Sequence, residues 1–191
     1  MRITKLENEQ ILLKPMKKGD ILKLEPIVYE PSIWQYKTNV IRNRQELLLY
    51  YQIALKERYP FVIINKSNNR WIGTTCYGNV SQKDKRLEIG WTWLDKGARG
   101  TGLNMACKYL LLEYAFEGLG FERVELKTST QNLPSRKAIL KIGAKEEGIL
   151  RNHTQLWNGS RRDTVYYGIL QKEWMEIKYS IFAKFSNAKG F

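Results

Sequence analysis

The fold is decided by one stretch of the sequence, Leu87-Glu-Ile-Gly-Trp-Thr-Trp-Leu-Asp-Lys-Gly-Ala-Arg-Gly-Thr-Gly-Leu-Asn-Met-Ala106. It begins as an apolar run typical of a strand, passes through a glycine-rich turn and enters a pattern typical of a helix. Gly97, Gly100 and Gly102 lack the Cβ atom that would hinder a tight turn or a close ligand. The first turn of a helix presents unpaired N–H groups and the positive end of its dipole. The stretch therefore predicts a pyrophosphate site, to which Arg99 adds a positive charge.

Two common nucleotide-binding loops do not fit this stretch. A Walker loop requires Lys and then Ser or Thr after its last glycine, whereas Leu103 and Asn104 follow Gly102. A dinucleotide-binding loop requires three glycines spaced as G-x-G-x-x-G, and Met105 occupies the third position. A pair of glycines after a strand is a weak motif by itself, so its interpretation depends on the rest of the chain.

The composition is that of an ordinary globular domain with a strong positive charge. Of the 191 residues, 43% are hydrophobic and 27% are charged, and the length allows one sizeable core. Lys and Arg number 32 against 19 Asp and Glu, so the net charge is +13. Such a charge suits nucleic acid, an acidic protein or a polyanionic cofactor. The basic residues form no run of five, so a direct nucleic-acid role is not favoured.

The cysteines and the N-terminal residues bear on the cellular compartment. Cys76 and Cys107 lie in apolar segments without metal-ligand spacing, which indicates buried thiols in a reducing cytosol and no bound metal. The first nine residues lack the apolar core of a signal peptide, and no apolar run is long enough to span a bilayer. We therefore expect a cytoplasmic protein that does not bind a membrane.

The hydrophobic pattern predicts a mixed α/β domain. Strands are expected at residues 11–14, 61–64, 70–80, 87–94 and 123–128, followed by a hairpin of 144–157 and 164–170 around Asn158-Gly159. Within 87–94, a period of two predicts that Leu87, Ile89, Trp91 and Trp93 face one side, and Glu88, Gly90, Thr92 and Leu94 the other.

Helices are expected between most of these strands. Residues 18–29 form a helical pattern with a break at Pro26, and 31–39 read as a loop with Trp34 and Tyr36 exposed. Asn43 opens a capping box for a helix that buries Leu47, Tyr50, Tyr51, Ala54 and Leu55. Further helices are expected at 103–117, from Asn132 to Lys141 with Gly143 as the cap, and at 172–185.

Three segments, taken in order and spacing, resemble the GNAT superfamily of acyl-CoA-dependent N-acetyltransferases: Glu88–Leu94, Arg99–Asn104 and Asn132–Ala144. The branch that they resemble is typified by the RimJ/RimL ribosomal-protein N-terminal acetyltransferases. The resemblance implies a mixed α/β GNAT fold with a twisted, mostly antiparallel sheet of about seven strands, splayed at the CoA site and flanked by helices. It covers about residues 10–174 of a single domain spanning 1–191, which leaves 175–191 as a C-terminal helical extension.

The resemblance implies that acetyl-CoA binds the glycine-rich loop and the strand before it. Loop N–H groups would hold the pyrophosphate, and free backbone groups of the strand would pair with the pantetheine arm. Arg99 replaces the family's usual anchoring residue, because Gly97 occupies that position. Trp91 and Trp93 could equally be core residues, and Asn132 could also cap its helix. The expected cofactor contacts are Trp91, Thr92, Trp93, Leu94, Arg99, Gly100, Thr101, Gly102, Leu103, Asn104, Asn132 and Arg136.

Acetyl transfer to a primary amine by direct attack requires a neutral amine and a stabilised oxyanion. Glu88 lies where the family often has its general base, although a salt bridge to a neighbouring Lys or Arg is the alternative. His153, the one histidine, lies on a strand that borders the acceptor cleft and can exchange protons near neutral pH. It could instead be a structural hydrogen-bonding residue. A water chain could also deprotonate the amine.

The departing thiolate requires a proton or a hydrogen bond, and here the chain departs from the family. The usual tyrosine position holds Ile139, whereas Ser135 matches the serine that the ribosomal branch places near the thiolate. Ser135 could also be an ordinary first-turn helix residue. Gln155 occupies a position that is acidic in the ribosomal-type enzymes.

These departures keep open a CoA-binding module without turnover, and the basic charge keeps open a ribosome- or RNA-associated protein. No motif identifies the acceptor, which could be a protein or peptide N-terminus or a small-molecule amine. Dimers are common among relatives, so a homodimer also stays open.

Overall fold

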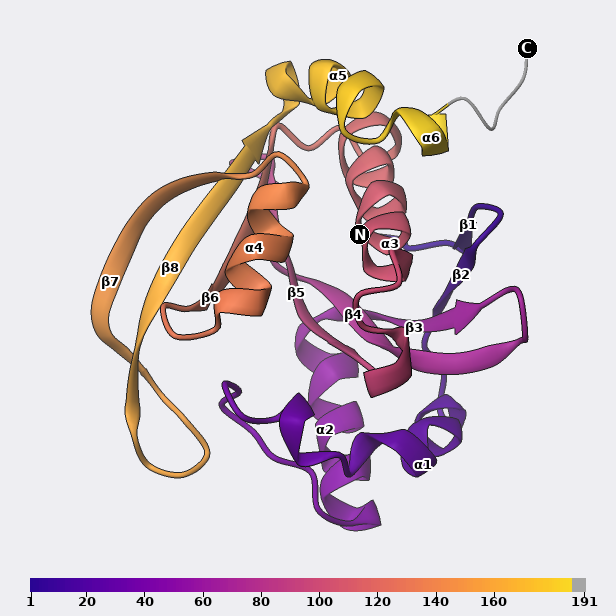
Figure 1. The fold of residues 1–191 in the computed structure, drawn as a ribbon, viewed down its shortest axis with the longest axis vertical. Coiled ribbons are helices and arrows are strands. Elements are labelled where there is room, and N and C mark those ends of the chain that lie inside the picture. The colour runs from indigo at the N-terminus through magenta and orange to yellow at the C-terminus, as the bar shows by residue number, and fades with distance from the viewer. Residues whose placement is uncertain (187–191) are drawn as a thin grey trace.

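The computed structural model describes residues 1–186, and its strands form one eight-stranded sheet in the order β1-β2-β3-β4-β5-β6-β8-β7 (Figure 1). All neighbouring strands are antiparallel except β5 and β6, which are parallel. One strand more than the expected number is present because residues 6 and 7 form the short β1. The strands are β1 (Leu6–Glu7), β2 (Ile11–Pro15), β3 (Tyr59–Asn65), β4 (Arg70–Ser81), β5 (Arg86–Leu94), β6 (Arg123–Ser129), β7 (Lys145–Gln155) and β8 (Arg161–Leu170).

The helices follow the expected order, with two breaks. Pro26 falls in the first turn of α1, where its missing N–H removes no helical hydrogen bond, so a 3₁₀ turn precedes α1 instead of one long helix. The expected terminal helix is divided into α5 and α6, and residues 187–191 of the expected extension lie outside the described residues. The helices are η1 (Asp20–Leu24), α1 (Glu25–Val28), η2 (Pro31–Ile33), α2 (Arg44–Glu57), η3 (Lys96–Ala98), α3 (Leu103–Glu113), the π-helical η4 (Tyr114–Gly118), α4 (Leu133–Lys141), α5 (Gln171–Ser180) and α6 (Ala183–Ser186).

The predicted caps of α2 and α4 are confirmed. Asn43 accepts a hydrogen bond from the N–H of Glu46 at 2.9 Å, and Asn132 accepts one from the N–H of Ser135 at 3.2 Å. Both side chains satisfy a donor in the first helical turn that has no partner within the helix. Gly143 follows α4 with a φ of 86°, a left-handed conformation that suits glycine.

Two hydrophobic cores lie on opposite faces of the sheet. Adjacent residues of β3 point to different cores: Phe61 and Ile63 pack with α3, α4 and α5, whereas Val62 and Ile64 pack with α1 and α2. Figure 1 shows α3 and α4 well separated from the α1–α2 region. We refer to these as the α3 core and the α2 core.

A β-bulge interrupts β5 in the middle of the stretch that decides the fold. The ladder to β4 shifts register between Thr74 and Cys76, so Trp91 and Thr92 of β5 lie opposite the single residue Thr75. Trp91 has a φ of 51°, in the left-handed region that residues other than glycine rarely adopt.

The bulge makes the expected alternation of β5 wrong beyond its midpoint. Leu87 and Ile89 pack in the α3 core, whereas Trp93 packs in the α2 core and Leu94 returns to the α3 core. One extra residue in a strand moves every later side chain to the other face. Trp93 is therefore a core residue, one of the two roles that the sequence left open.

Three side chains differ in exposure from the expectation: Trp34 and Tyr36 are more buried, and Leu55 is more exposed. Trp34 is only 2% exposed and donates from Nε1 to the carbonyl of Val28 at 2.7 Å. It packs edge-on against Tyr50 and near Trp93 and is therefore a core residue. Its burial could not be predicted because most of its neighbours in the sequence are polar. Leu55 of α2 is 46% exposed, because the helix turns that position away from the sheet. Tyr36, also expected at the surface, is partly buried.

The position of Trp34 predicts a large stability effect. Trp34→Ala should lower the free energy of unfolding by about 3–5 kcal/mol, because it leaves a cavity in the α2 core. Urea unfolding followed by circular dichroism measures the change. Tyr179→Ala, at a side chain that is 60% exposed, is the control and should change stability by less than about 0.5 kcal/mol. Equal effects of the two substitutions would contradict the burial of Trp34.

Candidate active site

The parallel strands β5 and β6 are joined over only three residue pairs. Their ladder runs from Arg86 and Arg123 to Glu88 and Glu125. Beyond it, β5 continues to Leu94 beside β4, and β6 continues beside β8 (Figure 1). Over residues 90–94, the edge of β5 that faces β6 therefore has no neighbouring strand within the described residues, and we call it the inner edge of β5. Such an edge can pair with an extended ligand as though the ligand were a strand.

The glycine-rich loop lies directly after this free edge. Gly100 and Gly102 have φ values of 77° and 92°, which residues other than glycine rarely adopt. Gly102 precedes the first turn of α3, and no side chain caps that turn. The buried Oδ1 of Asn104 has no hydrogen-bond partner within the described residues. The turn can therefore bind an anion through its N–H groups and the helix dipole.

The two arginines expected at CoA phosphates already have partners within the chain. Arg99 donates to the carbonyl of Leu94 at 3.0 Å and to Ser32 Oγ at 2.9 Å, which ties the loop to β5 and η2. Arg136 of α4 donates to Tyr167 Oη at 3.1 Å and also contacts Glu146. Arg99 stays beside the glycine-rich loop, whereas Arg136 joins α4 to the β7–β8 hairpin.

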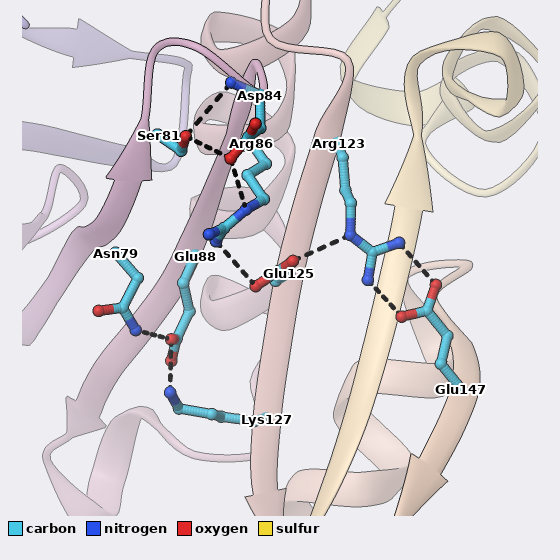
Figure 2. Close-up of polar contacts among 9 residues, drawn as sticks. All are labelled: Asn79, Ser81, Asp84, Arg86, Glu88, Arg123, Glu125, Lys127 and Glu147. Carbon is cyan, nitrogen blue, oxygen red and sulfur yellow. Dashed lines mark hydrogen bonds and ion pairs between the residues drawn. The ribbon is translucent and has the colours of Figure 1, made fainter.

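Glu88 is buried and held by two partners, as Figure 2 shows. Only 3% of the residue is exposed, and its Oε2 lies 2.8 Å from Lys127 Nζ and 2.6 Å from Asn79 Nδ2. The salt bridge considered from the sequence is therefore present. Both contacts use the same carboxylate oxygen, Oε2.

Glu88 and His153 lie on the same face of the sheet without touching. Lys127 pairs with Tyr166 in the β6–β8 ladder, and its ammonium lies 5.7 Å from the Tyr166 ring. The His153 ring lies 5.8 Å from the same ring, and its Nδ1 is 3.1 Å from Thr164 Oγ1. His153 is exposed. Contacts through Lys127 and Tyr166 therefore link Glu88 of β5 to His153 of β7.

Ser135 forms no side-chain hydrogen bond with either of these residues in the described part of the chain. It is the third residue of α4, and its N–H donates to the Asn132 side chain that caps the helix. Ile139, one turn later on α4, is 7% exposed and packs in the α3 core. The tyrosine role of the family is therefore not supplied from this helix position.

A chain of ion pairs fixes the end of the site where β5 and β6 meet. Arg123 of β6 pairs with Glu125 and with Glu147 of β7, and Arg86 of β5 reaches the same Glu125 at 3.8 Å (Figure 2). The Glu147 carboxylate raises the pKa of the Arg123 guanidinium above its usual range. These contacts hold the strands together beside the point at which they separate.

The sequence did not indicate two lysines that both donate hydrogen bonds to Thr92 at the bulge. Lys37 Nζ donates to the carbonyl of Thr92 at 2.8 Å, and Lys108 Nζ donates to Thr92 Oγ1 at 2.8 Å. Burial, together with the charges of Lys108 and Arg162, lowers the pKa of Lys37 to about 8, and burial lowers that of Lys108. Lys108 could have been noticed, because it is the single charged residue in the apolar run Met105–Leu112.

Neither cysteine is placed or ionised to act as a nucleophile. Cys76 and Cys107 are free and buried, and burial raises their pKa values to about 12 and about 11. Both are therefore neutral thiols at pH 7, and a covalent acyl-cysteine has no support. Over residues 1–186, no three His, Cys, Asp or Glu side chains are grouped as a metal site requires. No helix in the same range is long and apolar enough to cross a membrane.

Comparison with known proteins agrees with this geometry. Residues 10–145 match the acetyltransferase (GNAT) domain family. The uncharacterised N-acetyltransferase p20 of Bacillus licheniformis is 26% identical over 88% of this chain and 97% of its own. YdaF of Bacillus subtilis, provisionally named a ribosomal N-acetyltransferase, is 38% identical over 53% of this chain and 55% of its own.

A solved structure shares the fold over nearly the whole chain. RimJ of Mycobacterium smegmatis, in complex with CoA-disulfide, has a TM-score of 0.77 at 21% identity, over 95% of this chain and 93% of that chain. The family match extends over more than half of the 191 residues. The chain therefore belongs to the GNAT acetyltransferase family and resembles its RimJ-like members.

Proposed function

We propose that this acetyltransferase moves the acetyl group of acetyl-CoA to a primary amine by direct attack. The observation that carries the proposal is the free inner edge of β5 beside the glycine-rich turn of α3. The edge suits the pantetheine arm and the turn suits the pyrophosphate, so one ligand can use both. A relative of the same fold, RimJ, has been solved with a CoA derivative.

The chain's own residues divide the binding of acetyl-CoA between two elements. The backbone of Trp91–Leu94 would align the pantetheine arm, and Arg99–Asn104 would hold the pyrophosphate. The positive φ values of Gly100 and Gly102 and the uncapped first turn of α3 fit an anionic ligand at this turn. Asn132, which caps α4, is proposed to reach the pantetheine arm, and Arg136 a CoA phosphate.

Other residues of the chain are proposed to supply the proton transfers. We propose Glu88 as the base that takes the proton of the amine, directly or through a water, with His153 as the second candidate on that face. Ser135 is proposed to donate a hydrogen bond to the departing thiolate, because Ile139 has no proton to give. Binding both substrates in one cleft makes a covalent enzyme intermediate unnecessary.

The acceptor is proposed to be a peptide or protein N-terminus or a small-molecule amine, and the place of action the cytoplasm. The name of YdaF, a ribosomal N-acetyltransferase, supports an amine on a protein, and the two free cysteines suit a reducing compartment. A homodimer is proposed from the family resemblance alone.

Titration calorimetry with acetyl-CoA, followed by a thiol-release assay over amines and peptide N-termini, tests the proposal. Micromolar binding with turnover is expected. Binding without turnover on any acceptor would indicate a CoA-binding module, and salt-sensitive RNA affinity without CoA affinity would indicate a nucleic-acid-associated protein.

Substitution in the glycine-rich turn should remove acetyl-CoA binding. Gly100→Val forces a β-branched residue into a left-handed conformation, so the loop must change shape, and the affinity should fall at least about tenfold. Gly19→Val is the matched control, because Gly19 has a similar φ of 88° and, like Gly100, has no atom within 4 Å of an added Cβ. Calorimetry should show loss of affinity in the Gly100 variant alone. Unchanged affinity of both would contradict the assignment of the turn.

Substitution of the proposed base should slow catalysis in a pH-dependent way. Glu88→Gln should lower kcat/KM by about 10²–10⁴-fold at neutral pH. The loss should shrink as the pH rises, because more of the acceptor amine is then neutral without a base. Glu122→Gln is the control, since Glu122 also pairs with a lysine, Lys85 at 2.9 Å, but is exposed and takes no part in the ion pairs that join β5 to β6. A Glu88 variant as active as the control throughout the pH range would place the base elsewhere.

A further inference from the structure

A cavity of about 180 Å³ lies on the α2 side of the bulge. At roughly 30 Å³ per water molecule, it has the volume of about six waters, the size of a small side chain. Its walls combine four aromatic rings with two cationic side chains: Trp34, Tyr50, Trp91, Trp93, Lys37 and Arg58. Trp91 and Trp93 belong to the same part of β5 whose free edge is proposed to hold the pantetheine arm. The cavity therefore adjoins the proposed site of acetyl transfer.

Arg58 is a buried cation without an anionic partner. The residue is 8% exposed, its Nε has no hydrogen-bond partner, and it forms no ion pair with any residue in the range 1–186. Its guanidinium lies 4.7 Å from the Trp91 ring and 5.7 Å from the Tyr50 ring. Cation–π contacts recover only part of what a charge loses when it leaves water. A buried guanidinium in this state suits a carboxylate, which it can bind through two parallel hydrogen bonds.

The glycine at position 78 leaves the space in which the Arg58 side chain packs against Trp91. An added Cβ at Gly78 would lie 2.3 Å from the Trp91 ring and 3.3 Å from Arg58 Cγ. Only glycine at this position leaves room for the stacked pair. Arg58 itself follows the last turn of α2, and its N–H donates to the carbonyl of Ala54 at 3.0 Å.

A second cation and an unused donor line the same cavity. Lys37 donates to the Thr92 carbonyl and forms no ion pair within the described part of the chain. Lys108 and Arg162 lie near it and add positive charge. The buried Nε1 of Trp93 also has no hydrogen-bond partner. The cavity wall thus offers several donors and an excess of positive charge.

The carboxylates near the cavity do not neutralise this charge. Glu57 contributes to the lining but is exposed, so water screens its charge. Glu88, a buried carboxylate on the same face of the sheet as the cavity, is already held by Lys127 and Asn79. The cavity therefore keeps an excess of positive charge, which a bound anion would neutralise.

We propose that this cavity is an acceptor subsite for a carboxylate, so that the preferred acceptors are peptides with Asp or Glu close to the N-terminal amine. The inference rests on the proposed acetyl transfer and adds the class of its substrate. Arg58 binds the carboxylate, Lys37 adds a second positive charge, and the aromatic rings pack against the methylene groups beside it. The amine then lies near β5, where the acetyl group is delivered.

Acetylation of matched peptides tests the subsite. The peptides differ only by Asp against Asn, or Glu against Gln, at the first, second or third position. For wild-type protein we expect kcat/KM to be about 10- to 100-fold higher for the acidic member of at least one pair, as a charged hydrogen bond supplies. Added salt should reduce this preference.

Variants of Arg58 assign the preference to the cavity. Arg58→Gln should abolish it by lowering kcat/KM for the acidic peptide alone, with the KM for acetyl-CoA unchanged. Arg58→Lys retains the charge and should keep part of the preference. Arg44→Gln, at an exposed arginine that begins the same helix, is the matched control and should behave as wild type.

Three results would overturn the inference. Equal kcat/KM within every pair would exclude a carboxylate subsite and leave the proposed acetyl transfer intact. A preference that survives in Arg58→Gln would place the subsite elsewhere. A raised KM for acetyl-CoA in Arg58→Gln and Arg58→Lys, without a change in preference, would assign the cavity to CoA. Absence of turnover on every peptide and amine would instead overturn the proposed function, and the subsite with it.

Discussion

The site depends on one extra residue in β5. The bulge at Trp91 and Thr92 ends the regular ladder to β4 and turns the later side chains to the opposite face. It lies just beyond the three pairs that join β5 to β6, so the strand leaves its parallel neighbour with a free inner edge. The ion pairs of Arg123 and Arg86 hold the two strands together before this point. The three-pair ladder and its ion pairs hold β5 to β6, and the bulge that follows lets the two strands separate at this one place while the rest of the sheet stays paired.

Several positively charged side chains of the protein lie close together where β5 separates from β6. Lys37 and Lys108 both donate to Thr92, and Arg58 lies behind Trp91 without a carboxylate among the described residues. Buried cations in a globular protein are normally paired, because the loss of hydration is costly. Three cations are thus gathered around one bulge, although the sequence contains no basic run of five residues.

Local chemistry predicted much of the fold, whereas contacts distant in sequence determined the rest. Asn43, Asn132 and Gly143 mark helix ends through their own backbone hydrogen bonds, so their roles could be predicted. The bulge could not, because it depends on how β4 lies beside β5. Trp34 lies in a polar loop pattern and is buried among residues of α2 and β3 that are distant from it in sequence. Of the expected site residues, the strand and loop positions 91–94 and 99–104 lie together beside the opening, whereas Ser135 has no contact with Glu88 or His153 among the described hydrogen bonds.

Amide hydrogen exchange with and without acetyl-CoA tests the central claim most directly. If the opened edge of β5 and the turn of α3 form one binding surface, acetyl-CoA should slow exchange within residues 90–94 and 99–104 together. The three-pair ladder of Arg86–Glu88 should change little, because it is already closed by β6. Protection confined to other parts of the chain, or no protection at saturating acetyl-CoA, would contradict the account.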